Sequence, residues 1–149
     1  MKTLERLDSD LKDAMKARDE LRVMVLRTLK SDLKYKKIEL GHELSDDEAV
    51  GVLSSAAKKR RESIEEYRQG NRQDLADKEK AELEIISPYL PKQLSADELN
   101  VLVDKALAET NASSIKDIGA IMKVLMPEVR GRADGKVVNA AVRARLESK

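Results

Sequence analysis

The segment with the clearest chemical potential is Gly131–Lys136, which reads GRADGK. It places two glycines and two basic residues ahead of an apolar run, and this combination suits phosphate binding at a helix N-terminus. A nucleotide loop of the Walker A type follows the pattern G-x-x-x-x-G-K-[ST], whose hydroxyl binds Mg²⁺. Here the spacing is one residue short, and Val137 replaces the hydroxyl. We therefore exclude that nucleotide loop and interpret the segment as a turn between two helices, with Asp134 as the cap of the second.

Residues that carry catalysis or bind metals are scarce elsewhere. His42 is the only histidine, and it lies in a predicted exposed loop with no recognisable nucleophile partner. The carboxylate pair Glu65 and Glu66 lies in a helix rich in both charges, where ordinary i,i+4 pairing explains it. Residues 8–13 lack the glycine that a calcium loop needs at its sharp turn. We predict no catalytic residue, no metal site and no cofactor, although carboxylates distant in sequence can still converge in a fold.

Because the net charge is only +1, any electrostatic site must be local. The arrangement of the basic residues is therefore more informative than their number. One row lies on a single helical face, at spacings of three, four and three: Arg27, Lys30, Lys34 and Lys37. Such a row by itself is most often solvated surface. Residues 115–149 hold eight basic and four acidic residues, an excess of four positive charges that gathers around the glycine turn. For that cluster, phosphate contact and plain solubility both remain open. No tyrosine lies nearby to stack on bases, so a nucleic acid would be recognised through its backbone and shape.

The elements that must position these residues are helices, because apolar residues recur at steps of three and four almost throughout. Ser45–Glu48 and Ser95–Glu98 have the spacing of capping boxes, and Gly41 suits a helix C-terminus. No alternating run suggests a strand. We predict four long helices: one over residues 2–19, a second that carries Leu26 to Leu40 and ends at Gly41, and two more over 45–70 and 72–87. Short helices follow over 96–109, 114–126 and 136–146.

The segment around Pro88 and Pro91 interrupts this pattern, because proline inside a helix loses a hydrogen bond and clashes with the preceding turn. We predict an all-α protein with an N-terminal bundle of long helices, residues 1–90, and a small C-terminal three-helix domain, residues 91–149. The chain has no cysteine, no apolar leader and no membrane-spanning run. These features predict a cytoplasmic protein without a membrane partner.

Residues 117–142, DIGAIMKVLMPEVRGRADGKVVNAAV, resemble the signature of YqeY-like proteins and of the C-terminal tail of the B subunit of tRNA-dependent amidotransferases. The matching residues are Gly119, Met122, Met126, Pro127, Gly131, Ala133, Asp134, Val138 and Asn139. Residues 82–95 also resemble the interdomain segment of that family, so the likeness covers essentially the whole chain. Gly135 stands where the amidotransferase tail often has proline, which matches the stand-alone branch better.

The resemblance implies two all-helical domains and a link to tRNA, since the amidotransferase tail is associated with holding the tRNA body while other domains perform the chemistry. We expect a non-catalytic module that binds tRNA or another structured RNA, with no DNA partner. The expected contacts are cations and glycines of the C-terminal domain: Arg130, Arg132 and Lys136 on phosphates, Lys123 and Arg143 in support, and Gly131 and Gly135 for close backbone approach. An accessory or enzymatic role in glutamine-dependent tRNA transamidation is one alternative. A protein-interaction adaptor built on the N-terminal helices is another.

Overall fold

A computed structural model describes residues 2–148, and within that range the chain is α-helical with two short 3₁₀ turns and no strand. The all-α prediction is confirmed. The chain divides into two compact units, Met1–Pro91 and Lys92–Lys149. Whether each unit folds as an independent domain stays a prediction. The first unit contains α1 (Lys2–Ala17), α2 (Glu20–Leu40), α3 (Asp46–Gln69), α4 (Gln73–Ile86) and the 3₁₀ turn η1 (Ser87–Tyr89). The second contains α5 (Ala96–Thr110), η2 (Ile115–Asp117), α6 (Ile118–Val129) and α7 (Gly135–Glu147).

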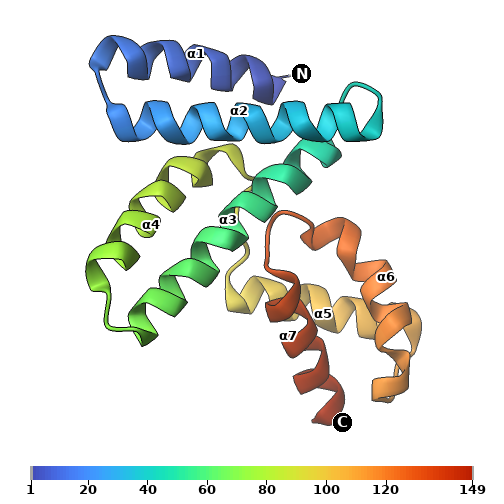
Figure 1. Cartoon of the computed structure of the whole chain (residues 1–149). Coiled ribbons are helices and arrows are strands. Elements are labelled where there is room, and N and C mark those ends of the chain that lie inside the picture. The colour runs from blue at the N-terminus through green and yellow to red at the C-terminus, as the bar shows by residue number, and fades with distance from the viewer. Residues whose placement is uncertain (1, 149) are drawn as a thin grey trace. The chain divides into compact units, whose positions relative to one another are not determined.

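The first unit consists of two antiparallel helical hairpins, α1 with α2 and α3 with α4 (Figure 1). Local chemistry sets their ends. The N–H of Arg22 donates to the Asp19 carboxylate at the start of α2, and Gly41 ends that helix with φ of +77°, a left-handed conformation that glycine adopts without steric cost. Ser45 and Glu48 form the predicted capping box at the start of α3.

Leucine and alanine side chains from all four long helices fill the core of this unit. On α1 the buried residues are Leu7, Leu11 and Ala14. Leu4 and Met15 continue the same spacing of three and four, yet these two are 36% and 51% exposed. They lie in the first and last turns of α1, outside the stretch from Leu7 to Ala14 that the core covers.

Tyr89 is part of the core of the first unit, although it lies between Pro88 and Pro91, where the helical pattern of the sequence is interrupted. Its hydroxyl donates to Asp10 at 2.5 Å, and the guanidinium of Arg6 lies 4.7 Å from the ring centroid. Arg6 also donates to the carbonyl of Pro88 at 2.9 Å. Burial and then the Asp10 carboxylate raise the pKa of Tyr89 to about 12. This residue therefore fastens η1 to α1.

The second unit packs α5, α6 and α7 around a core of aliphatic side chains (Figure 1). Ser95 and Glu98 form the predicted capping box of α5, and the pKa of Glu98 is lowered by the hydrogen bonds from Ser95. The expected helix 114–126 is wrong at both ends, since η2 precedes α6 and α6 runs through Pro127 to Val129. Val129 is fully buried, and burying it offsets the hydrogen bond that Pro127 cannot donate.

Candidate nucleic-acid interface

The glycine turn between α6 and α7 is built by local hydrogen bonds. The N–H groups of Arg132 and Ala133 both donate to the carbonyl of Val129, at 2.9 and 3.1 Å. Gly131 has φ of +75°, so a side chain at this position would be strained. Asp134 accepts from the N–H of Lys136 at 2.9 Å and caps α7, as the sequence predicted. Gly131 and Asp134 thus each have a structural role in the turn.

The segment before α5 holds this turn in place. The Gln93 side chain donates to the carbonyl of Gly131 at 2.8 Å, and the N–H of Leu94 donates to the carbonyl of Arg132 at 2.8 Å. Arg132 returns these contacts: its Nε donates to the carbonyl of Lys92 at 3.1 Å, and its Nη1 donates to that of Glu128 at 3.4 Å. The turn is therefore a fixed loop, because residues 92–94 and the end of α6 both form hydrogen bonds with it.

The predicted contact cations fall into two groups by how their charges are used. Arg130 and Lys123 are exposed, and among residues 2–148 neither side chain has an ion pair or hydrogen-bond partner. Arg132 is half-buried and bonded to carbonyls, while the Nε of Arg143 donates to Asn139 at 2.8 Å. Lys136 is exposed at the first turn of α7. The structure thus leaves Arg130 and Lys123 as the cations that are most accessible to an external phosphate.

Helix geometry groups these cations in two rows flanking the turn. Lys123 of α6 and Arg130, which caps the end of that helix, lie seven residues apart, and Lys136 and Arg143 lie seven apart along α7. A separation of seven residues is close to two full turns, so each pair shares one helical face. Lys116, which the prediction omitted from the contact residues, continues the first spacing into η2 and is exposed. The recurring interval of seven was the signal that could have identified it.

The fold requires the backbone conformation of glycine at position 131 but not at position 135. Gly131 needs its positive φ, whereas Gly135 has no such conformation and a Cβ atom there would meet no atom within 4 Å. Glycine costs roughly 0.5–1 kcal/mol relative to alanine inside a helix. The fold therefore gives no account of Gly135, and its open surroundings suit the predicted close approach of a ligand.

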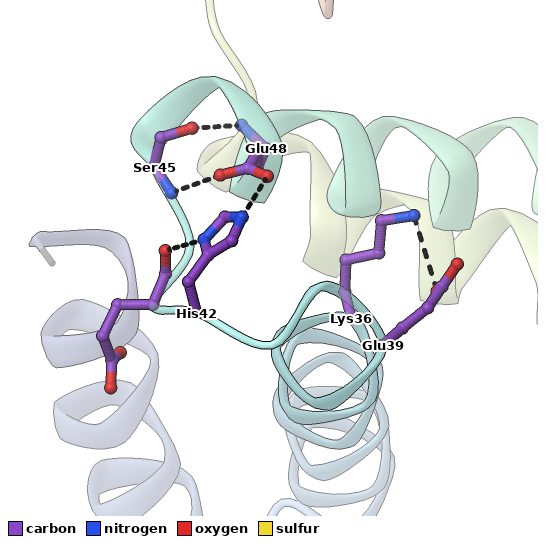
Figure 2. Close-up of polar contacts among 6 residues, drawn as sticks. Lys36, Glu39, His42, Ser45 and Glu48 are labelled. Carbon is purple, nitrogen blue, oxygen red and sulfur yellow. Dashed lines mark hydrogen bonds and ion pairs between the residues drawn. The ribbon is translucent and has the colours of Figure 1, made fainter.

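His42 belongs to a separate polar cluster at the start of α3 (Figure 2). Its Nδ1 lies 2.7 Å from the carbonyl of Glu43, so that nitrogen must carry the proton, and its Nε2 lies 3.7 Å from the Glu48 carboxylate. The Ser45 hydroxyl accepts from the N–H of Glu48 at 3.1 Å. In return the Ser45 backbone N–H donates to the Glu48 carboxylate at 2.9 Å, and the hydrogen bonds with Ser45 lower the pKa of Glu48. The contacts among His42, Glu48 and Ser45 cap the start of α3. They do not form a catalytic pair, because no hydrogen bond joins His42 to Ser45 as base to nucleophile.

Within residues 2–148, no group of three or more histidine and acidic side chains is arranged to hold a metal ion. In the same part of the chain, no helix combines the length and the apolar composition that a membrane crossing requires.

The fold and the turn together define a small two-unit helical protein whose second unit carries a fixed basic turn. The chain belongs to the YqeY-like protein family, whose model it matches over residues 4–146. It is similar to the "Altered inheritance of mitochondria protein 41, mitochondrial" of three yeasts. The protein from Lachancea thermotolerans is 36% identical over 75% of this chain and 62% of its own length. That from Vanderwaltozyma polyspora is 36% identical over 71% and 59%. The Saccharomyces cerevisiae protein is 32% identical over 87% and 69%.

The matched part spans about three fifths of the first two relatives. Their names contradict the cytoplasmic location predicted from the sequence, because all three relatives are named as mitochondrial proteins. The prediction was wrong because it rested on the lack of cysteine, of an apolar leader and of a membrane-spanning run, and none of these features tells the cytoplasm from a mitochondrial compartment.

Proposed function

We propose that this chain is a non-catalytic module that binds tRNA or another structured RNA through the basic turn of its second unit. The observation that carries the proposal is the pair of exposed cations, Lys123 on α6 and Arg130 at the C-terminal cap of that helix, which have no partner among residues 2–148 and lie about two helical turns apart beside a fixed loop. Because these cations stand on an ordered backbone, binding a phosphate orders their side chains but not the loop that carries them. The resemblance of residues 117–142 to an amidotransferase tail also supports this function.

Roles within the turn follow from the contacts. Lys123 and Arg130 bind phosphates, with Lys136 and Arg143 as the second row. Arg132 is a positioning residue, because its guanidinium holds the turn against Lys92 and Glu128. Recognition then rests on the backbone and shape of a folded RNA, so duplex DNA of equal length is expected to bind more weakly.

The test is the salt dependence of binding of total tRNA to the full chain. For Lys123→Ala/Arg130→Ala, we expect the slope of log affinity against log salt to fall by about 2, because about one unit is lost with each phosphate contact. The control variant Lys59→Ala/Lys80→Ala removes the same charge from exposed positions of the first unit and is expected to leave the slope unchanged. Both variants should melt like the wild type, whereas Arg132→Ala should melt at a lower temperature.

Absence of tRNA binding at low salt, or an unchanged slope in Lys123→Ala/Arg130→Ala, would refute the proposal. The enzymatic alternative, a component of glutamine-dependent transamidation, has its own outcome. Formation of amidated tRNA from glutamine and mischarged tRNA by the purified chain would favour it over a purely binding role.

A further inference from the structure

The outward face of α2 in the first unit carries apolar and cationic side chains that the fold does not use. Met24, Tyr35 and Ile38 are 44%, 79% and 68% exposed, while the opposite face of the helix is buried in the core through Val25, Leu26, Leu29 and Leu33. Exposed apolar side chains that gather on one face beside polar ones mark an interaction surface. Among residues 2–148, nothing covers the outer one.

These residues form a regular stripe, which we call the α2 stripe: Met24, Arg27, Ser31, Lys34 and Ile38. Their spacing is three, four, three and four, as in a coiled-coil seam, but only the two end positions are apolar and the three central ones are polar. Tyr35 lies beside the stripe next to Lys34. The stripe extends over fifteen residues, or about 21 Å between its ends at the α-helical rise, enough for two heptads of a partner.

The charges of the α2 stripe lie in its middle and are uncompensated. Lys30 pairs with Asp8 and Lys37 with Glu43, the latter at 2.5 Å, so half of the basic row seen in the sequence is neutralised within the unit. Arg27 and Lys34 have no ion pair or hydrogen bond among residues 2–148. A partner helix must therefore bring carboxylates to the centre of the stripe and apolar side chains to its two ends.

Two surface hollows lie beside the α2 stripe, where α2 adjoins α1, and share Arg27. One, of about 740 Å³, is lined by Leu4, Leu33 and Lys34, and the other, of about 660 Å³, is lined by Met15 and Met24. Leu4 and Met15 are the α1 residues that the core leaves exposed. Grooves of this kind receive the side-chain ridges of an opposing helix, whereas a flat membrane surface has no side chains to insert into them.

We propose that the α2 stripe is the docking surface for an acidic amphipathic helix of another protein. A second copy of this chain is disfavoured, because it would oppose Arg27 and Lys34 to cations. RNA fits the stripe less well, because it would engage Arg27, Lys34 and Tyr35 but leave Met15, Met24 and Ile38 without an apolar partner. The proposal does not depend on RNA binding by the second unit.

The test uses the full chain and a fluorescent three-heptad helical peptide with leucine at its outer seam positions and glutamate at its central ones. A matched peptide carries lysine in place of glutamate. We expect saturable binding of the acidic peptide only, measured by anisotropy. In Arg27→Glu/Lys34→Glu, the preference should reverse, with at least a tenfold loss for the acidic peptide and a gain for the lysine peptide. The variant Lys59→Glu/Lys80→Glu changes the same charge on exposed positions of α3 and α4 and should bind like the wild type.

Tyr35→Ser/Ile38→Ser should also weaken binding of the acidic peptide, and both side chains are exposed enough to be replaced without loss of helix content. Failure of the acidic peptide to bind, equal binding of the two peptides, or indifference to the charge reversal would overturn the proposal. A different ligand would also overturn it. If phosphatidylglycerol vesicles or tRNA bind the wild type and Lys59→Glu/Lys80→Glu but not Arg27→Glu/Lys34→Glu, the stripe binds that ligand and not an acidic helix.

Discussion

At the scale of single residues, side chains of the same type have taken on different tasks. Arg130 and Arg132 are two positions apart in the turn, yet Arg130 is exposed without a partner and Arg132 is bonded to two carbonyls. Sequence composition treats them alike, because it counts charge and not the direction of a side chain. The capping residues Ser45, Ser95 and Asp134 were predictable, since a cap acts on N–H groups two or three positions away.

Tyr89 gives a prediction at this scale. Its folded pKa is raised above its ordinary value, so the stability that its neutral hydroxyl contributes is fully present below about pH 10 and is lost as the pH rises toward 12. Tyr89→Phe should lower the free energy of unfolding at neutral pH by about 1.5 kcal/mol, because the bond to Asp10 is lost. Urea unfolding over a pH series should show the alkaline loss of stability reduced in the variant. An identical alkaline profile in the wild type and Tyr89→Phe would contradict this role.

At the scale of elements, the pairing of α3 with α4 includes an ion pair that no local pattern announces. Arg60 and Glu82 lie 3.9 Å apart, and their side chains are 14% and 11% exposed. Arg60 also donates to the carbonyl of Ala56 at 3.1 Å. The pair is twenty-two positions apart in sequence, so only the antiparallel packing of the two helices brings it together.

Arg60→Ala should therefore lower the free energy of unfolding by about 3 kcal/mol, because it leaves the Glu82 carboxylate buried without its partner. Arg60→Met/Glu82→Leu should recover most of that loss, since it removes both charges and keeps the volume. As a control, Arg72→Ala breaks the exposed pair with Asp74 and should scarcely change the free energy of unfolding. Chemical denaturation of the four proteins checks these values, and a double variant no more stable than Arg60→Ala would show that burial of charge is not the cause.

At the scale of the whole molecule, the two compact units raise the question of independent folding. We predict that residues 92–149 fold alone as a cooperative helical domain with low stability, about 3–5 kcal/mol, since so short a chain has a small core. Thermal melting followed by circular dichroism tests this. A fragment of residues 95–149 lacks Lys92, Gln93 and Leu94, which bond the glycine turn, and should melt at a lower temperature. A broad, non-cooperative transition in the longer fragment would contradict the domain prediction.

The sequence by itself determined the features that arise between near neighbours: the all-helical character, the caps, the left-handed Gly41 and the basic turn between two helices. The tertiary structure alone decided which residues at the ends of each stripe are covered. It buried Tyr89, left Leu4, Met15 and Ile38 exposed, and engaged Arg132 while sparing Arg130. The physical reason is that helical periodicity fixes the face of a residue, whereas burial depends on where the neighbouring helix begins, ends and crosses.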